Sequence, residues 1–313
     1  MAKDKKIFFV GLGNMGHPMA NNLIEAGNQL CLFDLEKPKA KLLLEKGATW
    51  ADTLEEGAKD ADVVMTSLPG PPQVQEVILS KSGVLQYMPP HTTLIDTTTS
   101  SQPMAIEIAN VAKQKNIDYL ESPITNAVDA AREGRLAIFV GGEEKTFSEH
   151  LPLLKIIGKD IFHVGTHGNG AVMKLITNLL WFVNAAAIGE GLMLGAKSGI
   201  PLDVVAKSIT ASAGNSWVAE HDIPSIFKGH YDPSFSLALC TKDLGLILDI
   251  AKSQGIDLKM GKMAGELFTK AQTKYGANAA ELHVVKLLED EVGLYLRPPH
   301  GSDKSSNHSS ENT

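Results

Sequence analysis

The chain is poor in cysteine, with only Cys31 and Cys240 among 313 residues. Two cysteines cannot form the disulfide framework of a small secreted protein. Both lie in apolar runs, so we expect buried, reduced thiols. Aromatic residues are scarce, at 6%, and none are interleaved with a basic patch. Because the formal net charge is −7, we do not expect nucleic acid as a partner.

The sequence also lacks an apolar run of membrane-spanning length. The best candidate, residues 179–188, is short, contains Asn184 and lies between Lys174 and Glu190. The amino terminus, MAKDKK, leads directly into an apolar strand pattern, without the features of a signal peptide. We therefore predict a cytoplasmic protein that has no membrane segment, with the interior of an organelle as the alternative if a segment was cleaved before Met1.

Glycine is plentiful, and three glycines have a spacing that carries chemistry. Gly11, Gly13 and Gly16 follow the apolar run 7–10 and open a helical pattern over 15–23. In a G-x-G-x-x-G turn the first glycine permits the tight turn, the second admits a pyrophosphate and the third lets helix pack on strand. A glycine-rich turn without a ligand is the alternative, but the strand before and the helix after favour a dinucleotide site.

An acidic residue lies where such a site needs one. Asp34 ends a second apolar strand, 29–33, and stands 21 positions after Gly13 (34 − 13). A carboxylate there binds the adenosine ribose hydroxyls and repels the extra phosphate of NADP. Lys37 and Lys39 keep NADP open as an alternative, and we predict NAD.

Strands and helices alternate through the first half of the chain, and polar loops follow the strands. This pattern predicts an α/β Rossmann-type domain with a doubly wound parallel sheet. The remaining strands are expected at 63–68, 93–95, 119–121, 136–140 and 161–164, and the helices at 38–49, 73–79 and 104–116. Ligands bind such sheets at the carboxyl ends of the strands, where the loop of Pro69 to Pro72 lies.

The pattern becomes wholly helical after GTHGNG, at residues 165–170. We predict a Rossmann domain over 1–165 and an all-α domain for substrate and oligomerisation over 166–297, joined by a long interdomain helix. The polar tail 298–313 has no apolar residue and is expected to be disordered. Helices are expected at 171–198, 201–211, 237–254, 260–275 and 282–292.

Two polar residues stand on the long apolar helix. Lys174 and Asn178 are four positions apart and therefore share a face. A buried lysine without a partner is costly, so Lys174 either reaches solvent or lines a cleft, where its pKa can fall towards neutrality. In that second case it can serve as an acid or base.

Other candidates have structural interpretations of equal or greater weight. Lys242 and Asp243 are typical of a helix start, and Thr98 to Ser101 are typical of a loop and helix cap before Pro103. Trp217 fits a pocket or a core. The spacing of His17, His163 and His167 matches no ligand signature, and we predict no metal site.

Taken together, three segments resemble the β-hydroxyacid dehydrogenase family, of the 3-hydroxyisobutyrate dehydrogenase type. They are VGLGNMGHPMANNL at 10–23, GNGAVMKLITN at 168–178 and FSLALCTKDL at 235–244, in the family's order. The resemblance covers Lys6 to about Arg297. It implies a Rossmann domain, a long helix and a helical domain like the C-terminal domain of 6-phosphogluconate dehydrogenase, with the active site at the seam.

The resemblance also implies roles for individual residues. Lys174 would be the catalytic acid and base, Asn178 would hold the substrate, and Lys242 would close over the cofactor. Residues implied in cofactor binding are Gly11, Leu12, Gly13, Asn14, Met15, Gly16, Asp34, Leu68, Pro69, Thr99, Phe235 and Lys242. Residues implied in substrate binding are Thr125, Asn126, Ala127, Asn178 and Trp217.

Two segments depart from the family pattern. The usual Asp-x-Ser-Thr-x-x-Pro has one extra residue between Asp96 and Pro103. The usual Pro-Val-Ser-Gly-Gly is Pro-Ile-Thr-Asn-Ala at 123–127. Thr125 keeps a hydroxyl for a substrate carboxylate, whereas Asn126 and Ala127 add side chains where glycines let the backbone approach.

These features predict an oxidoreductase that uses NAD, or NADP, to transfer hydride to or from a small β-hydroxyacid or its semialdehyde. A homodimer or homotetramer is expected from the resemblance. An imine-reductase-like relative is a second interpretation, although such relatives generally lack the lysine. A non-catalytic dinucleotide-binding sensor or scaffold is a third interpretation. Substrate turnover would indicate an enzyme, whereas cofactor binding without turnover would indicate the sensor or scaffold.

Overall fold

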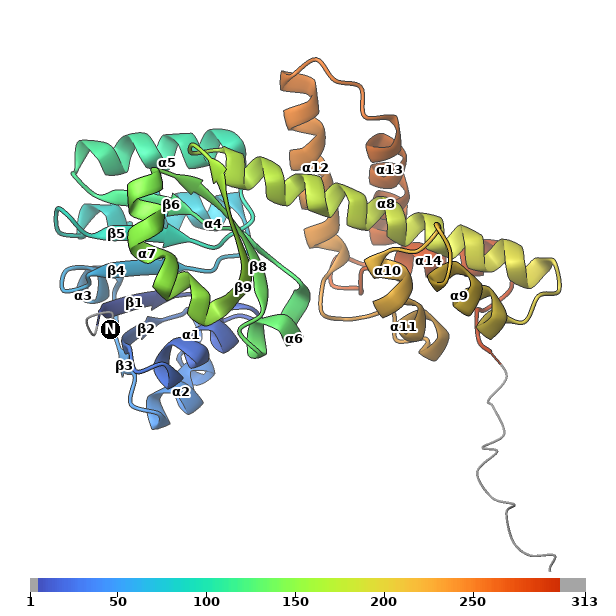
Figure 1. Ribbon diagram of the computed structural model, residues 1–313, viewed down its shortest axis with the longest axis horizontal. Coiled ribbons are helices and arrows are strands. Elements are labelled where there is room, and N and C mark those ends of the chain that lie inside the picture. Colours follow the sequence, from blue (N-terminus) through green and yellow to red (C-terminus); the bar gives the residue numbers. More distant parts are fainter. Residues whose placement is uncertain (1–4, 299–313) are drawn as a thin grey trace, which may run out of the picture. The chain divides into compact units, whose positions relative to one another are not determined.

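A computed structural model describes residues 5–298 (Figure 1). By its contacts the chain divides into two compact units. The sheet unit contains the chain up to Leu179 together with Lys242–Leu258, and the helical unit contains Leu180–Thr241 and the chain from Lys259. The domain boundaries at 165 and 297 stay predictions, and the tail after residue 298 lies outside the described residues.

The sheet has the strand order β3-β2-β1-β4-β5-β6-β8-β7, with β9 paired to β8. The strands are β1 (Lys6–Val10), β2 (Gln29–Phe33), β3 (Thr49–Trp50), β4 (Val63–Thr66), β5 (Thr93–Asp96), β6 (Asp118–Glu121), β7 (Ile124–Thr125), β8 (Leu136–Gly142) and β9 (Gly158–Gly165). From β3 to β6 every pair is parallel. The order reverses between β1 and β4, where doubly wound sheets bind their ligands.

The predicted doubly wound parallel sheet is confirmed from β3 to β6, and β8 is an exception within it. This strand runs antiparallel to β6 and to β7, which lie in succession along it. Only the short helix α6 (Ala127–Arg132) separates β7 from β8. Such a short connection returns the chain beside the strand it left, and neighbours joined in this way are antiparallel. Strand β9 restores a parallel pairing with β8.

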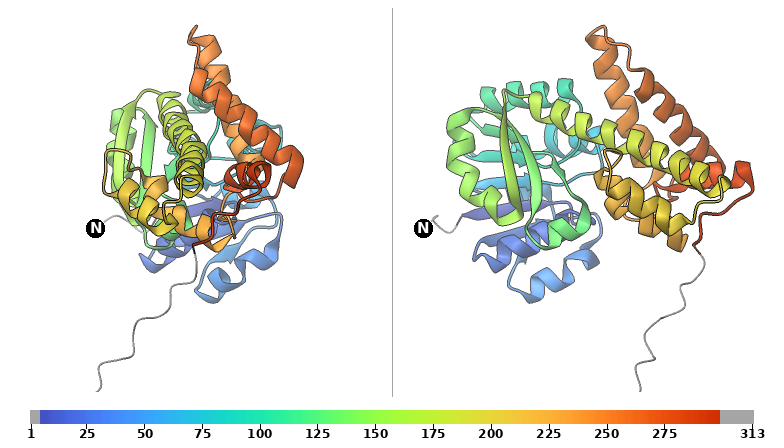
Figure 2. Two further views of the ribbon diagram at one scale, coloured as in Figure 1. Left: turned by 90° about the vertical axis from the view of Figure 1, so that its right-hand side faces the viewer. Right: turned by 45° about the vertical axis from the view of Figure 1, so that its right-hand side comes forward.

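Helices cover both faces of this sheet, as the two views in Figure 2 show. One face packs against α1 (Gly16–Glu25), α2 (Lys41–Glu45), α6 and α7 (Glu144–Ile157), through Met19, Leu43, Ala131 and Leu154 among others. The other face packs against α3 (Leu54–Ala58), the π-helical turn 75–79 after α4 (Pro71–Val74) and α5 (Gln102–Gln114). A strand that buries both faces has a continuous apolar sequence. This explains why the sequence predicts β1 and β4.

Local signals explain where the helices start and stop. Ser101 caps α5 by accepting a hydrogen bond from the Met104 N–H at 3.3 Å, as the Thr98-to-Ser101 segment predicts. The helix predicted over 38–49 is shorter: a 3₁₀ turn at Lys37–Ala40 leads into α2, and the chain then forms β3. Gly47 ends this helix with a positive φ of 99°.

After β9, the named elements of the described residues up to 298 are all helices. They are α8 (Asn169–Lys197), α9 (Leu202–Thr210), α10 (Trp217–His221), α11 (Ile223–Lys228), α12 (Leu237–Ser253), α13 (Lys259–Tyr275) and α14 (His283–Val292). Five of these were predicted nearly at their observed bounds. Helices α10 and α11 are not predicted by the sequence, because each is too short to show a helical period.

Helix α8 is long and apolar enough to cross a membrane by length and composition alone, and no other helix in residues 5–298 is. A core helix passes the same test, so this is a weak indication of a membrane segment. The helix carries Lys174, Asn178 and Glu190, of which the first two are buried.

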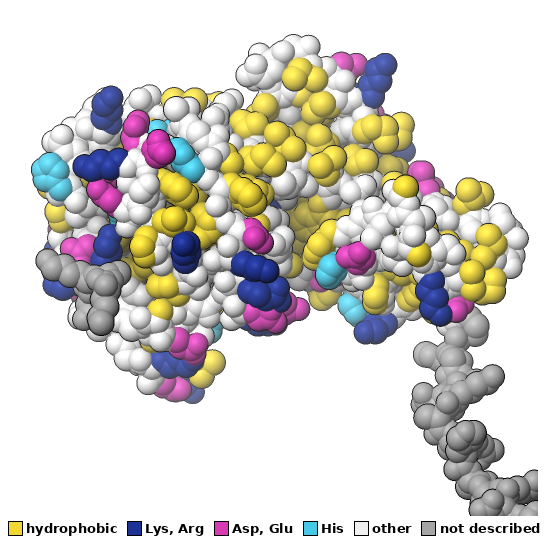
Figure 3. Space-filling model, viewed as in Figure 1, with side chains coloured by type: hydrophobic (Ala, Val, Ile, Leu, Met, Phe, Trp, Pro, Cys, Tyr) yellow, Lys and Arg dark blue, Asp and Glu magenta, His cyan; other side chains and the backbone are white. Residues whose placement is uncertain are grey.

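On the sheet unit, charged side chains of both signs are interspersed over the face seen in Figure 3.

Two glycines at the β1–α1 turn should respond differently to an added methyl group. A Cβ at Gly16 would lie 1.9 Å from the Gly11 carbonyl oxygen, so Gly16→Ala must displace the turn. We expect a loss of about 1–3 kcal/mol in the free energy of unfolding, as for other overpacked sites. A Cβ at Gly13 meets nothing within 4 Å, so Gly13→Ala is the matched control and should change stability by less than about 0.5 kcal/mol. Chemical denaturation of both variants tests this, and equal losses would contradict it.

Candidate functional site

The turn between β1 and α1 is open where a ligand phosphate would lie. Gly11 has a φ of 98°, which favours glycine, and its N–H donates to the Phe33 carbonyl at 2.9 Å. Helix α1 has no side-chain cap, so no side chain blocks its amino-terminal end from a ligand. Gly13 and Asn14 are exposed and border a cavity of about 570 Å³. The turn therefore has the open backbone that an anion needs.

Asp34 is held at the end of β2, beside that turn. One carboxylate oxygen accepts the Leu12 N–H at 2.7 Å and the other accepts the Glu36 N–H at 2.9 Å. The Lys39 ammonium lies 3.5 Å from the same carboxylate. Lys39 also lines the cavity, as does Arg132. The acidic residue predicted from the spacing is thus placed and oriented by the turn itself.

A hydrogen-bond network joins the carboxyl ends of β4 and β5. Asp96 accepts hydrogen bonds from the Thr66 hydroxyl at 2.7 Å and the Thr98 N–H at 3.1 Å. The Thr98 hydroxyl in turn accepts the Leu68 N–H at 3.0 Å. Burial raises the pKa of Asp96 to about 6, and these hydrogen bonds oppose that rise. The loops carrying Leu68 and Thr99 are therefore fixed by side chains beneath them.

Lys242 connects α12 to the same two loops. Its ammonium donates to the Pro69 carbonyl at 3.0 Å and to the Thr99 carbonyl at 3.4 Å. It also forms an ion pair with Asp243 at 2.9 Å. Gly70 leaves room for this side chain, because a Cβ there would lie 3.0 Å from the Lys242 Cδ. Three residues predicted from the resemblance thus meet at one point.

Lys174 is buried on α8, with 6% of its surface exposed. Its ammonium makes no hydrogen bond or ion pair with any residue in the described range 5–298. Burial lowers its pKa to about 8, an effect that Asp243 opposes and Lys242 reinforces. An ammonium in this state changes protonation near neutral pH, as an acid–base group must.

Asn178 lies one turn further along α8 and is also buried. Its side-chain amide donates to Asp243 at 2.7 Å. Asp243 is 1% exposed, and its carboxylate interacts with both polar residues of the helix. By its sequence context, Asp243 is typical of a charge at a helix start. Its position six residues after 237 (243 − 237), where the helix is predicted to begin, could have shown that it lies beyond the cap.

Glu121 is a second residue that the sequence analysis missed. At the end of β6, it accepts hydrogen bonds from the N–H groups of Gly168 at 2.5 Å and Gly170 at 2.8 Å. Burial raises its pKa to about 7, opposed by these hydrogen bonds. A carboxylate on the first N–H groups of α8 satisfies them and fixes where that helix begins. Glu121 is therefore a positioning residue for Lys174.

The segment after β6 adopts the backbone that glycine would favour. Asn126 has a φ of 84° and Ala127 a φ of 61°. Asparagine tolerates this left-handed region, whereas alanine is strained there. Both side chains are exposed, and Thr125 is half-buried at the end of β7. Both residues that stand where the family pattern has glycine therefore lie in the left-handed region.

Two further predicted site residues lie in the helical unit. Trp217 begins α10, is 45% exposed and stacks on His221 with ring centroids 4.2 Å apart. Phe235 packs against Trp181 and Phe182 within that unit. Their roles in binding stay predictions.

Two of the three histidines lie close together, and the third lies elsewhere in the sheet unit. His17 borders the cavity beside the β1–α1 turn. His163 contacts the Gly142 carbonyl at 2.8 Å, and a Cβ at Gly142 would lie 3.3 Å from the His167 Nε2. His167 also contacts the Tyr119 carbonyl at 3.0 Å.

Ala127→Gly should stabilise the protein, because glycine relieves the strain of a left-handed alanine. A left-handed residue with a Cβ costs roughly 1–2 kcal/mol, and glycine returns roughly 0.5–1 kcal/mol as chain entropy. We expect a net gain of up to about 1 kcal/mol in the free energy of unfolding. The control is Ala109→Gly inside α5, where the same change should cost about 1 kcal/mol. Urea denaturation measures both, and a loss of stability in both would refute the assignment of strain.

Comparison with known proteins covers almost the whole chain. Residues 6–165 match the family model described as the NAD binding domain of 6-phosphogluconate dehydrogenase. Residues 168–288 match the model described as NAD-binding of NADP-dependent 3-hydroxyisobutyrate dehydrogenase.

Individual relatives give the same result. The chain is 34% identical over 295 residues to 2-(hydroxymethyl)glutarate dehydrogenase of Eubacterium barkeri, covering 94% of this chain and 98% of that one. It is 35% identical to 3-hydroxyisobutyrate dehydrogenase of Pseudomonas aeruginosa, covering 84% and 91% of the two chains. The crystal structure of a 3-hydroxyisobutyrate dehydrogenase from Salmonella typhimurium superposes with a TM-score of 0.83 at 30% identity, covering 91% and 100%.

Proposed function

The chain belongs to the 3-hydroxyisobutyrate dehydrogenase-like family of NAD(P)-dependent β-hydroxyacid dehydrogenases, and we propose that Lys174 is its general acid and base. The observation that carries this proposal is the burial of the Lys174 side chain, whose ammonium has no hydrogen-bond or ion-pair partner in residues 5–298. An amine kept in this state has a free lone pair or proton for a substrate.

The proposed step needs a proton and a hydride to move together. NAD(P), when bound, supplies the hydride acceptor or donor. In oxidation, neutral Lys174 takes the proton of the substrate hydroxyl as the carbinol carbon loses hydride. In reduction, the Lys174 ammonium returns that proton to the carbonyl oxygen. Because the lysine pKa is about 8, both protonation states are populated near neutral pH.

The neighbours of Lys174 support its role. Asn178 is held in one orientation by its 2.7 Å hydrogen bond to Asp243, which lets its amide position a substrate rather than rotate freely. Asp243 keeps the pKa of Lys174 from falling further. Pre-oriented groups of this kind lower the entropic cost of reaching the transition state.

We propose NAD as the dinucleotide, held at the β1–α1 turn. The open backbone at Gly13 and the uncapped start of α1 suit the pyrophosphate. The carboxylate of Asp34 suits ribose hydroxyls and disfavours a 2′-phosphate. Lys242, bonded to the Pro69 and Thr99 carbonyls, would cover the loops that contact the rest of the cofactor.

We propose a small β-hydroxyacid, or its semialdehyde, as the substrate. The relatives are named for 2-(hydroxymethyl)glutarate and 3-hydroxyisobutyrate, and both compounds carry a carboxylate and a hydroxyl. The Thr125 hydroxyl and the backbone at Asn126 and Ala127 would bind that carboxylate. The cytoplasmic location and the dimeric or tetrameric assembly stay predictions.

A cofactor-reduction assay over a panel of β-hydroxyacids, with NAD and with NADP, tests the function. The panel includes 3-hydroxyisobutyrate, 3-hydroxypropionate, serine, glycerate, threonate and three-carbon sulfonates. We expect turnover of one compound with a lower KM for NAD, and a loss of at least about 100-fold in kcat for Lys174→Ala. Oxidation should rise with pH through a midpoint near 8, and reduction should fall, because oxidation needs neutral Lys174.

Asp243→Asn sharpens this prediction. Removing the negative charge should lower the pKa of Lys174, so the midpoint of the oxidation profile should move below 8. Asp249→Asn, at an exposed position on the same helix, is the matched control and should leave the midpoint in place. Full activity in Lys174→Ala would refute the mechanism, and cofactor binding without turnover of any compound would favour the non-catalytic alternative.

A further inference from the structure

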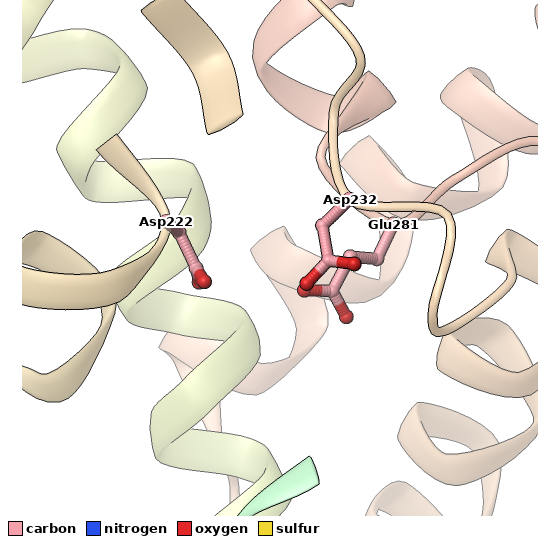
Figure 4. Close-up of side chains that lie close together, drawn as sticks. All are labelled: Asp222, Asp232 and Glu281. Atoms are coloured by element: carbon pink, nitrogen blue, oxygen red, sulfur yellow. The ribbon is translucent and has the colours of Figure 1, made fainter. Parts of the chain in front are cut away.

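Three carboxylates that the proposed reaction does not use converge in the helical unit. Asp222 lies between α10 and α11, Asp232 in the segment after α11, and Glu281 between α13 and α14. One oxygen from each lies within 4.8 Å of the others. Figure 4 shows Asp232 and Glu281 side by side, with Asp222 on the other side of the space between them. The three residues come from segments far apart in the sequence.

The buried members of this cluster lack the partners that buried carboxylates normally have. Asp222 and Glu281 are each 2% exposed. Neither oxygen of Glu281 has a hydrogen-bond partner, and one oxygen of Asp222 has none. Asp222 also occupies the residue before α11, where an aspartate usually caps the helix, but its side chain does not do so. These oxygens point into the cluster and not to the backbone.

No described lysine or arginine neutralises the cluster. The basic residues nearby in this unit are committed elsewhere: Arg297 pairs with Glu289 at 3.0 Å and Lys286 with Asp290 at 2.7 Å. The Trp181 indole N–H, which does not reach hydrogen-bond geometry, and the His221 ring both favour the charged form of Asp222. Burial raises the pKa of Asp222 to about 7, and burial with two neighbouring carboxylates raises the pKa of Glu281 further. Negative charge at this place therefore needs a counter-charge.

We propose that Asp222, Asp232 and Glu281 bind a divalent cation of the hard, oxygen-preferring class, such as Ca²⁺. The donor set contains only carboxylate oxygens, which suits that class and disfavours zinc or copper. Two oxygens that each lie about 2.3–2.6 Å from one ion can be up to about 5 Å apart, so the 4.8 Å spread fits a shared ion. Asp232 is half-buried, which leaves a side for water ligands.

The cation would hold together segments that the backbone already aligns. The Glu281 N–H donates to the Phe235 carbonyl at 2.9 Å, and Leu237 N–H donates to the Ala279 carbonyl at 2.8 Å. These bonds join the segment carrying Asp232 to the turn carrying Glu281. Through Asp222, the ion would also attach the corner between α10 and α11 to these two segments. The site is therefore a stabilising element of the helical unit, separate from the sheet unit that carries Lys174.

The full chain, treated with EDTA and dialysed, tests this site in two ways. Thermal unfolding is measured without metal, with Ca²⁺ and with Mg²⁺, and we expect Ca²⁺ to raise the Tm by several degrees. Tb³⁺ is then added as a luminescent substitute for Ca²⁺. Excitation of tryptophan should give Tb³⁺ emission, because Trp181 lies beside Asp222. Trp181→Phe should remove most of that emission while the Ca²⁺ response stays.

Variants identify the ligands. Glu281→Gln should remove the Ca²⁺ response and lower Tb³⁺ affinity at least tenfold. If the Glu281→Gln protein does not fold, Asp232→Asn, at a half-buried position, replaces it and should have the same effects. Asp290→Asn removes a carboxylate already paired with lysines and should leave the response unchanged, as should Lys174→Ala. The proposal is overturned if the wild-type chain shows neither a Ca²⁺-dependent Tm nor Tb³⁺ emission, or if Glu281→Gln has a higher Tm than the wild type in saturating Ca²⁺, since the carboxyls would then share protons and not an ion.

Discussion

The ammonium of Lys174 is buried without an ion pair in residues 5–298, and the groups around it limit the cost of that burial. A pKa near 8 in place of 10.5 corresponds to roughly 3 kcal/mol against the charged form. Asp243 offsets part of this cost without contacting the ammonium, because its carboxylate is already bonded to Asn178 and paired with Lys242. The charged form of Lys174 is therefore destabilised enough for the amine to titrate near neutral pH, and the amine remains available to a substrate.

Two anchors place this lysine against the sheet. Glu121 binds the first N–H groups of α8, so the helix begins at the end of β6. Lys242 bonds to the loops after β4 and β5, so α12 presents Asp243 to Asn178. Both anchors are charged side chains on backbone groups. The same parallel-sheet edge that suits a dinucleotide thus also fixes the acid–base group.

The sequence predicted the parts of this site that depend on local patterns. The glycine spacing, Asp34 and the pair Lys174 and Asn178 follow from short-range periodicity and turn chemistry. The antiparallel β8 was not predicted, because strand direction depends on which neighbour the returning chain meets. Glu121 binds Gly168, which lies 47 positions away in the sequence, and Asn178 binds Asp243, which lies 65 positions away. The carboxylates at 222, 232 and 281 show no ligand spacing, because three separate loops bring them together.

The titration of Lys174 itself is the most direct test of this account. Lysine labelled with ¹³C at Cε can be followed by NMR across pH 6–11, with Lys174→Ala used to assign its signal. The account predicts a titration midpoint near 8 for Lys174, well below the other lysines. A midpoint near 10.5 would mean that the ammonium is solvated, and would contradict its role as the acid–base group.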